Sequence, residues 1–165
     1  MRILNCGAGN STYGTDRIDF AKTPTTTLVW DLEKGIPFPD ETFDIVFSQS
    51  FLEHLTNVGF HLNECYRVLK KGGLIDIITD NAACVRFYWK GMATHDGRYE
   101  KLHPGDHHYS VHTKQHLLNH FKKAGFNNIH LSYVKTDTIG KWLDFIIFQK
   151  PRIRVTAYKL LNQSE

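Results

Sequence analysis

The sequence is short of the features that define several classes of protein. Only three of its 165 residues are cysteines, Cys6, Cys65 and Cys84, and none belongs to a Cys-x-x-Cys pair. A disulfide framework and a structural zinc site are therefore not expected. The protein is expected in a reducing compartment. No apolar run is long enough to span a membrane, and the first residues enter a strand pattern without a signal peptide. These absences favour a cytoplasmic protein.

The sequence also has only a small excess of positive over negative charge. The chain has 20 Lys and Arg against 17 Asp and Glu, and a net charge of +3 does not indicate nucleic-acid binding. The hydrophobic share of 41%, with 13% aromatic residues, is typical of a folded domain and not of a disordered chain. Histidine, in contrast, is plentiful, with ten residues. We expect one domain over residues 1–150, followed by a basic tail over 151–165.

Short apolar runs alternate with helical patterns along the chain. We expect strands over the following ranges: 2–6, 14–20, 26–30, 43–48, 74–79, 127–135 and 142–149. Alternation of this kind predicts an α/β fold, a Rossmann-like three-layer sandwich. Its seven-stranded sheet is expected to be mostly parallel, with an antiparallel last strand.

Helix signals lie between these runs. Ser50 and Glu53 have the spacing of a capping box and are expected to open a short helix. A second helix presents Leu62, Cys65, Tyr66 and Leu69 on one face, with Gly72 as its expected C-terminal cap. Thr113 is expected to cap a helix that runs to Lys123.

A glycine-rich turn, Cys6-Gly7-Ala8-Gly9-Asn10, follows the first expected strand. Glycine lets a backbone approach a ligand where a Cβ would collide. The next two strands end near single carboxylates, Asp19 (with Asp16 as the competing candidate) and Asp31. Because the carboxyl ends of parallel strands meet at one edge of a sheet, this combination indicates a site for a nucleoside-bearing ligand. An ordinary tight turn and solvated acids are the alternative interpretation.

The stretch over residues 28–55, with the glycine turn upstream, closely resembles the core of class I S-adenosylmethionine (SAM) dependent methyltransferases. The resemblance is to the type 11, or UbiE/COQ5-like, subgroup, and it covers residues 3–80 well and 113–149 loosely. The sequence departs from the family at Asn5, where the pattern has an acid, and at Ser11, where it has a third glycine.

The resemblance implies SAM as the cofactor and a methyl group transferred to an oxygen or nitrogen acceptor on a small molecule or a glycan. Asp19 matches the acid that binds the ribose hydroxyls, and Asp31 matches the acid near the adenine amino group. Tyr13 and Tyr109 are expected to line the transfer site. The expected cofactor-binding residues are Asn5, Cys6, Gly7, Ala8, Gly9, Asp19, Asp31, Leu32, Ser48, Gln49 and His54.

An expected insertion over residues 93–112 contains five of the ten histidines and would cover the acceptor site. His107 or His108 would take the proton from a hydroxyl acceptor. The spacing matches no standard zinc pattern, so no metal is expected. A metal site built from His103, Asp106, His107, His108 or His112 is the alternative.

Two other functions compete with methyl transfer. A noncatalytic SAM-binding or partner-binding module is compatible with Asn5, which lacks the charge of the family's acid and would contact the cofactor more weakly. An NAD-dependent oxidoreductase would need the third glycine, which this sequence lacks. The expected partner is a small-molecule or glycan acceptor. An RNA base is compatible but not indicated, and no membrane is expected. A second copy of the chain could complete the cofactor-side wall as a homodimer.

Overall fold

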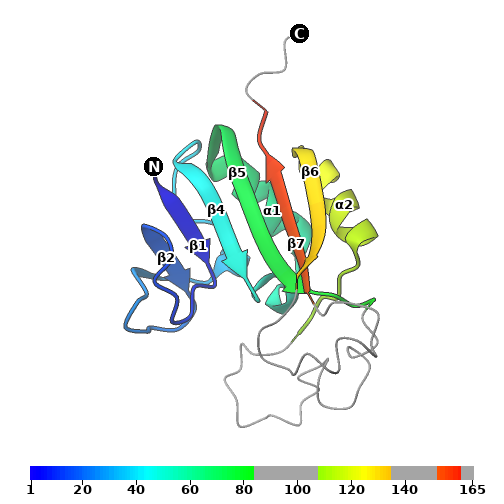
Figure 1. The fold of residues 1–165 in the computed structure, drawn as a ribbon. Coiled ribbons are helices and arrows are strands. Elements are labelled where there is room, and N and C mark those ends of the chain that lie inside the picture. Colours follow the sequence, from blue (N-terminus) through cyan, green and yellow to red (C-terminus); the bar gives the residue numbers. More distant parts are fainter. Residues whose placement is uncertain (84–107, 135–151, 161–165) are drawn as a thin grey trace.

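The computed structural model describes residues 1–83, 108–134 and 152–160 (Figure 1). Its strands form one seven-stranded sheet in the order β3-β2-β1-β4-β5-β7-β6. Strand β7 runs antiparallel to both of its neighbours, and the other pairings are parallel, which confirms the expected fold class. The strands are β1 (Ile3–Cys6), β2 (Asp16–Asp19), β3 (Leu28–Val29), β4 (Phe43–Gln49), β5 (Leu69–Asp80), β6 (Asn127–Val134) and β7 (Arg152–Tyr158).

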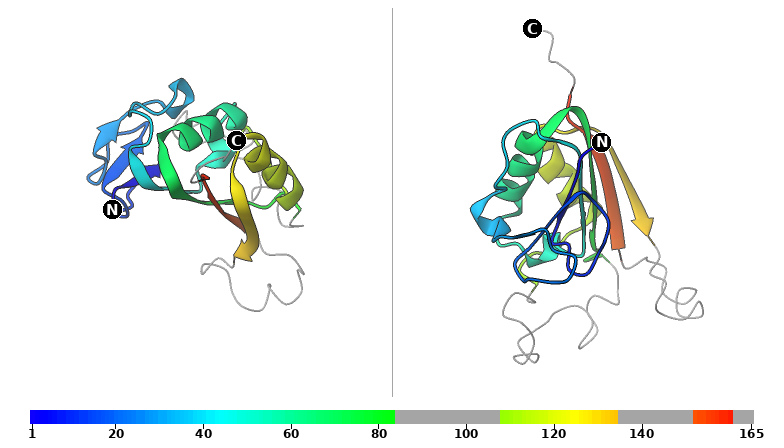
Figure 2. Two further views of the ribbon diagram at one scale, coloured as in Figure 1. Left: turned by 90° about the horizontal axis from the view of Figure 1, so that it is seen from above. Right: turned by 90° about the vertical axis from the view of Figure 1, so that its left-hand side faces the viewer.

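Both α-helices of the described residues, α1 (Val58–Val68) and α2 (Lys114–Lys123), pack on the same face of this sheet (Figure 2). Two short 3-10 helices, η1 (Leu32–Lys34) and η2 (Leu52–His54), follow β3 and β4. The described residues therefore supply two of the three expected layers. No helix among them is both long and apolar enough to cross a membrane.

Helix ends follow the sequence in one place and depart from it in two. Thr113 caps α2 as expected, because its hydroxyl accepts the amide N–H of His116. The expected capping box at Ser50 is wrong, because Ser50 has a left-handed φ of 52° and η2 begins after Phe51 without a side-chain cap. The expected cap at Gly72 is also wrong: Leu69 already pairs with β4, and Gly72 lies within β5.

The expected tail after residue 150 is wrong, because Arg152–Tyr158 form β7 in the interior of the sheet, between β5 and β6. Ile153, Val155 and Ala157 are fully buried, and the residues between them point to the other face. The sequence does alternate at period two here, which is a strand signal that the basic composition obscured. The strand expected over 142–149 and most of the insertion expected over 93–112 lie outside the described residues.

His112 is buried at the join between β5 and α2. Its carbonyl oxygen accepts the N–H of Ala82, and its Nε2 lies 3.1 Å from the hydroxyl of Ser110. Burial, reinforced by the charge of nearby His120, lowers the pKa of His112 to about 4 from an ordinary 6.5. The folded protein therefore resists protonating this side chain, whereas the unfolded chain does not.

Ending the chain after residue 150 should abolish cooperative folding, whereas ending it after residue 160 should not. Each buried aliphatic side chain of β7 contributes roughly 1.5–3 kcal/mol, and β5 would also lose its pairing partner. The total stability of a domain is only about 5–15 kcal/mol. Calorimetry and far-UV circular dichroism of the two truncations test this, and a cooperative transition in the shorter chain would contradict the assignment of β7.

Acidification should destabilise the protein through His112. Because the folded pKa lies below the unfolded value, stability is lost as the pH falls from about 6.5 to about 4, by roughly 3 kcal/mol at most. The fall in melting temperature between pH 7 and pH 4.5 should therefore be smaller in His112→Gln than in the wild type. His130→Gln, at an exposed position of β6, is the matched control, and it should keep the wild-type pH dependence. Equal pH dependence in all three proteins would contradict the assignment.

Candidate active site

The glycine turn after β1 is fixed by side chains of β2 and of the loop that follows β2. The N–H of Gly9 donates to Asp19 Oδ2 at 2.7 Å, and the hydroxyls of Thr23 and Thr25 donate to the Gly9 carbonyl at 2.7 and 3.0 Å. Gly9 has a φ of 52°, and no heavy atom lies within 4 Å of the position that a Cβ would take. The turn therefore presents an open stretch of backbone at the carboxyl end of the sheet, as a ligand would require.

Asp19, and not the competing Asp16, is the acid at this turn. Its second oxygen accepts the N–H of Ala21 at 2.9 Å, whereas Asp16 is held by the guanidinium of Arg2 at 2.8 Å. Each carboxylate oxygen has two acceptor sites, so both Asp19 oxygens retain capacity for a ligand hydroxyl. Asn5, at the family's acidic position, is buried and donates to the carbonyl of Tyr13 at 3.0 Å.

Two cavities lie at the carboxyl ends of the strands. The smaller, of about 260 Å³, is lined by Asn5, Gly7 and Ala8 of β1 and its turn, and by Gln49 and Ser50 at the end of β4. It is predominantly polar in its lining residues, which suits the amino-acid portion of a ligand. Four of the expected cofactor-binding residues therefore meet in this cavity.

The larger cavity, of about 370 Å³, contains Asp31, Leu32 and His54 of the expected residues and is walled by Trp30 and Phe51. The Trp30 indole is held in place, because its N–H donates to the Gly35 carbonyl at 2.9 Å. Asp31 caps η1 by accepting the N–H of Glu33 at 3.1 Å, and Lys34 lies 3.4 Å away. A carboxylate beside an aromatic wall fits a purine base with an exocyclic amine.

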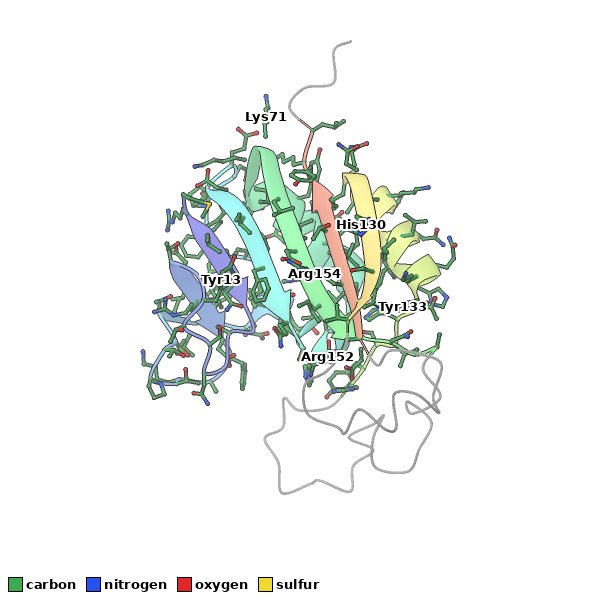
Figure 3. All side chains as sticks on the ribbon, in the orientation of Figure 1. Tyr13, Lys71, His130, Tyr133, Arg152 and Arg154 are labelled. Carbon is green, nitrogen blue, oxygen red and sulfur yellow. The ribbon has the colours of Figure 1, made fainter. Side chains whose placement is uncertain are left out.

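Other expected residues lie apart from these cavities. Cys6 and Ser48 are paired in register on β1 and β4, are buried, and do not line either cavity. The hydroxyl of Ser48 has no hydrogen-bond partner among the described residues. Tyr13 packs edge-on against Phe47, with ring centroids 4.8 Å apart, on the sheet face opposite the helices (Figure 3). Tyr109, in contrast, lines the larger cavity.

A cluster of acids and histidines adjoins the larger cavity. Glu53 is buried and accepts the hydroxyl of Thr79 at 2.7 Å; burial and then the charge of Asp80 raise its pKa. His108 Nδ1 lies 3.6 Å from Asp80 Oδ2, and its ring stands edge-on to His54 at 4.8 Å between centroids. Potential ligand atoms of Glu53, His54 and His108 lie within 4.8 Å of one another, so this group could hold a metal ion.

The backbone explains how His108 reaches this cluster. The N–H groups of Tyr109 and Ser110 both donate to the carbonyl of Glu53, at 2.9 and 3.1 Å, and the Ser110 hydroxyl donates to the Leu52 carbonyl. The end of the expected insertion is thus fastened to η2. His107 lies outside the described residues. The positions of Glu53 and Asp80 beside His108 were missed because sequence spacing gives no signal for a cluster assembled from η2, β5 and a distant loop.

Comparisons with known proteins match part of the chain to methyltransferases. Residues 6–77 match a type 11 family model described as Methyltransferase domain. A ubiquinone biosynthesis O-methyltransferase of Rhizobium johnstonii is 34% identical over 80 residues, which cover 42% of this chain and 32% of that protein. One of Bradyrhizobium sp. is 44% identical over 55 residues, covering 33% of this chain and 20% of that protein. The chain thus spans a third or less of the length of these curated relatives.

Solved structures agree in fold. A SAM-dependent methyltransferase of Thermotoga maritima, described as a possible histamine N-methyltransferase, has a TM-score of 0.70 at 15% identity and covers 96% of this chain and 82% of its own. Phosphoethanolamine N-methyltransferase 2 of Haemonchus contortus, in complex with SAM, has a TM-score of 0.67 at 14% identity, with 97% and 49% covered. At these identities the likeness establishes the fold alone. The family match and the curated relatives indicate the predicted class, a SAM-dependent methyltransferase, without singling out its UbiE/COQ5-like members.

Proposed function

We propose that the protein is a SAM-dependent methyltransferase that methylates a hydroxyl oxygen of a small molecule. The observation that carries the proposal is the pair of cavities that adjoin at Ser50 and Phe51, one polar and one aromatic with an acid. A ligand with an amino-acid end and a purine end needs these two environments next to each other. The match of residues 6–77 to the methyltransferase model supports the same choice.

The residues present fit the cofactor. Asp31 would accept a hydrogen bond from the exocyclic amine of the adenine, and Trp30 and Leu32 would pack on the adenine ring. Asp19 would accept hydrogen bonds from the ribose hydroxyls. The open backbone at Gly9 and the polar side chain of Gln49 would face the remaining part of the cofactor. When bound, SAM supplies an electrophilic methyl group on a sulfonium centre, so that the protein's main task is to align the acceptor.

The acceptor's proton needs a base, and His108 is the one that we propose. Asp80 lies 3.6 Å from its Nδ1 and would orient the imidazole, in the way that a carboxylate orients a general base. His54 stands between His108 and the larger cavity, where Tyr109 forms part of the wall. Glu53, with its raised pKa, keeps a second proton site beside the pair.

The choice of a hydroxyl acceptor rests on this base and on the names of the curated relatives, which are O-methyltransferases of ubiquinone biosynthesis. An amine acceptor needs less help from a base. Amine-bearing molecules, a glycan and hydroxyl-bearing ubiquinone precursors are therefore the three arms of an acceptor screen. Binding of SAM without turnover on any arm would favour the noncatalytic module instead.

Asp31→Ala should weaken SAM binding by about tenfold or more, whereas Asp40→Ala should leave it unchanged. A lost hydrogen bond to a charged group costs about 1.5–3 kcal/mol. Asp40 is a matched acid, because it is exposed and pairs with Arg67 at 2.8 Å, away from both cavities. Isothermal titration with SAM, its demethylated product and NAD measures this. Binding of NAD in place of SAM would overturn the proposed function, and equal SAM affinities of the two variants would overturn the role of Asp31.

His108→Gln should reduce turnover by about 10²-fold and leave SAM affinity within about threefold, because a general base acts on the acceptor and not on the cofactor. His116→Gln, on the exposed side of α2, is the control and should keep wild-type turnover. The assay is transfer of a labelled methyl group to the best acceptor of the screen. Unchanged turnover in His108→Gln would remove His108 from the mechanism, and loss of turnover with a chelator would promote the metal alternative.

A further inference from the structure

The ring of Phe51 stands at the boundary between the two cavities. Phe51 lines the larger cavity, whereas its neighbour Ser50 and the backbone of Gly7 line the smaller one. A Cβ built on Gly7 would lie 2.2 Å from Phe51 Cδ2 and 2.4 Å from Cγ. The ring is therefore in close contact with the Gly7 backbone, and the absence of a side chain at Gly7 makes room for the ring.

This contact conflicts with a ligand that occupies both cavities. In the proposed site, the purine end lies beside Asp31 and the amino-acid end beside Gly7 and Gln49. Gly7, which lines the smaller cavity, is in contact with Phe51, which lines the larger one, so a single molecule that joins these ends would pass the backbone of Gly7 at this contact. The phenyl ring occupies the approach to that backbone.

The backbone around Phe51 is held by hydrogen bonds, so that a movement in this segment would be a rotation of the side chain, which packs against the edge of the hydrophobic core. The N–H of Ser50 donates to the carbonyl of Ile78 at 2.9 Å, and the N–H of His54 donates to the carbonyl of Phe51 at 2.9 Å. Ser50 adopts a left-handed φ of 52°, a costly conformation for a residue with a Cβ. The ring is only half-buried and stands edge-on to His61, with 5.4 Å between centroids.

We propose that Phe51 is a gate in the cofactor cleft, whose ring closes the passage over Gly7 and rotates away about its Cα–Cβ bond when SAM enters. The proposal rests on the proposed function, because it assumes that one ligand spans both cavities. A closed ground state reduces the apparent affinity by the fraction of molecules in which the ring is open. It also makes ring rotation a step that limits the rate of association.

The test is stopped-flow mixing with SAM, followed by intrinsic tryptophan fluorescence, since Trp30 is a wall of the larger cavity. Phe51→Ala should raise the association rate constant and the affinity by about tenfold, as expected if about one molecule in ten has the ring open. Phe51→Leu has a shorter apolar side chain, and its association rate constant and affinity should lie between those of Phe51→Ala and the wild type. Phe60→Ala removes a partly exposed phenylalanine of α1 that lines neither cavity, and it should bind at the wild-type rate.

Melting temperatures of all four proteins establish that the variants are folded, and the Leu variant keeps the test usable if the Ala variant is unstable. Weaker SAM binding in both Phe51 variants would overturn the gate and make the ring a platform on which the cofactor packs. Wild-type rates and affinities in both would overturn it as well. SAM binding by the Phe51 variants and not by the wild type would support it. If neither the wild type nor any folded variant binds SAM, the proposed function fails, and the gate falls with it.

Discussion

The hydrogen bond between the Gly9 amide and the Asp19 carboxylate is the interaction on which the site depends. The described chain passes from β1 to β2 through residues 7–15 without a helix, so that no packed element fixes the turn. Asp19 of β2 supplies that constraint by accepting the N–H of Gly9, and the hydroxyls of Thr23 and Thr25 donate to the carbonyl of Gly9. One carboxylate thus sets the position of the open backbone and is itself placed at the ligand's edge of the sheet.

Side-chain pairs also stabilise the sheet. With α1 and α2 on one face, the opposite face of the described sheet is covered by its own side chains (Figures 2 and 3). Arg154 of β7 makes two hydrogen bonds to Asp76 of β5, at 2.8 and 2.6 Å, and this bidentate pair leaves only 8% of Asp76 exposed. Farther along, Tyr13 lies edge-on to Phe47. Charge-assisted bonds of this geometry are among the stronger interactions available at a partly exposed position.

The sequence alone was sufficient for the elements whose signals are local. Periodicity placed β1, β4 and α1, and the hydroxyl of Thr113 marked the start of α2. The sequence was not sufficient for elements whose secondary structure is decided by pairing with distant strands. The segment after Val68 became strand and not cap because it pairs with β4, and Arg152–Tyr158 were hidden by a composition that reads as a basic tail. Asp19 and Asp31 could be found at strand ends, whereas the Glu53 and Asp80 cluster exists only after η2, β5 and the loop at His108 meet.

That cluster and the proposed gate share one short segment, so that η2 lies at the centre of the proposed site. Phe51 precedes it, Glu53 and His54 belong to it, and its carbonyl at Glu53 receives two amides from the loop that brings His108. A rotation of Phe51 would leave these backbone bonds intact, because they involve main-chain atoms on the other side of the turn. Cofactor entry can therefore be separated from the placement of the base. The carboxyl group of Glu53 is buried here with a hydrogen bond from Thr79, and its burial raises its pKa. A segment of only a few residues can thus hold a mobile ring and a fixed proton site side by side, as long as the strands on either side hold its backbone.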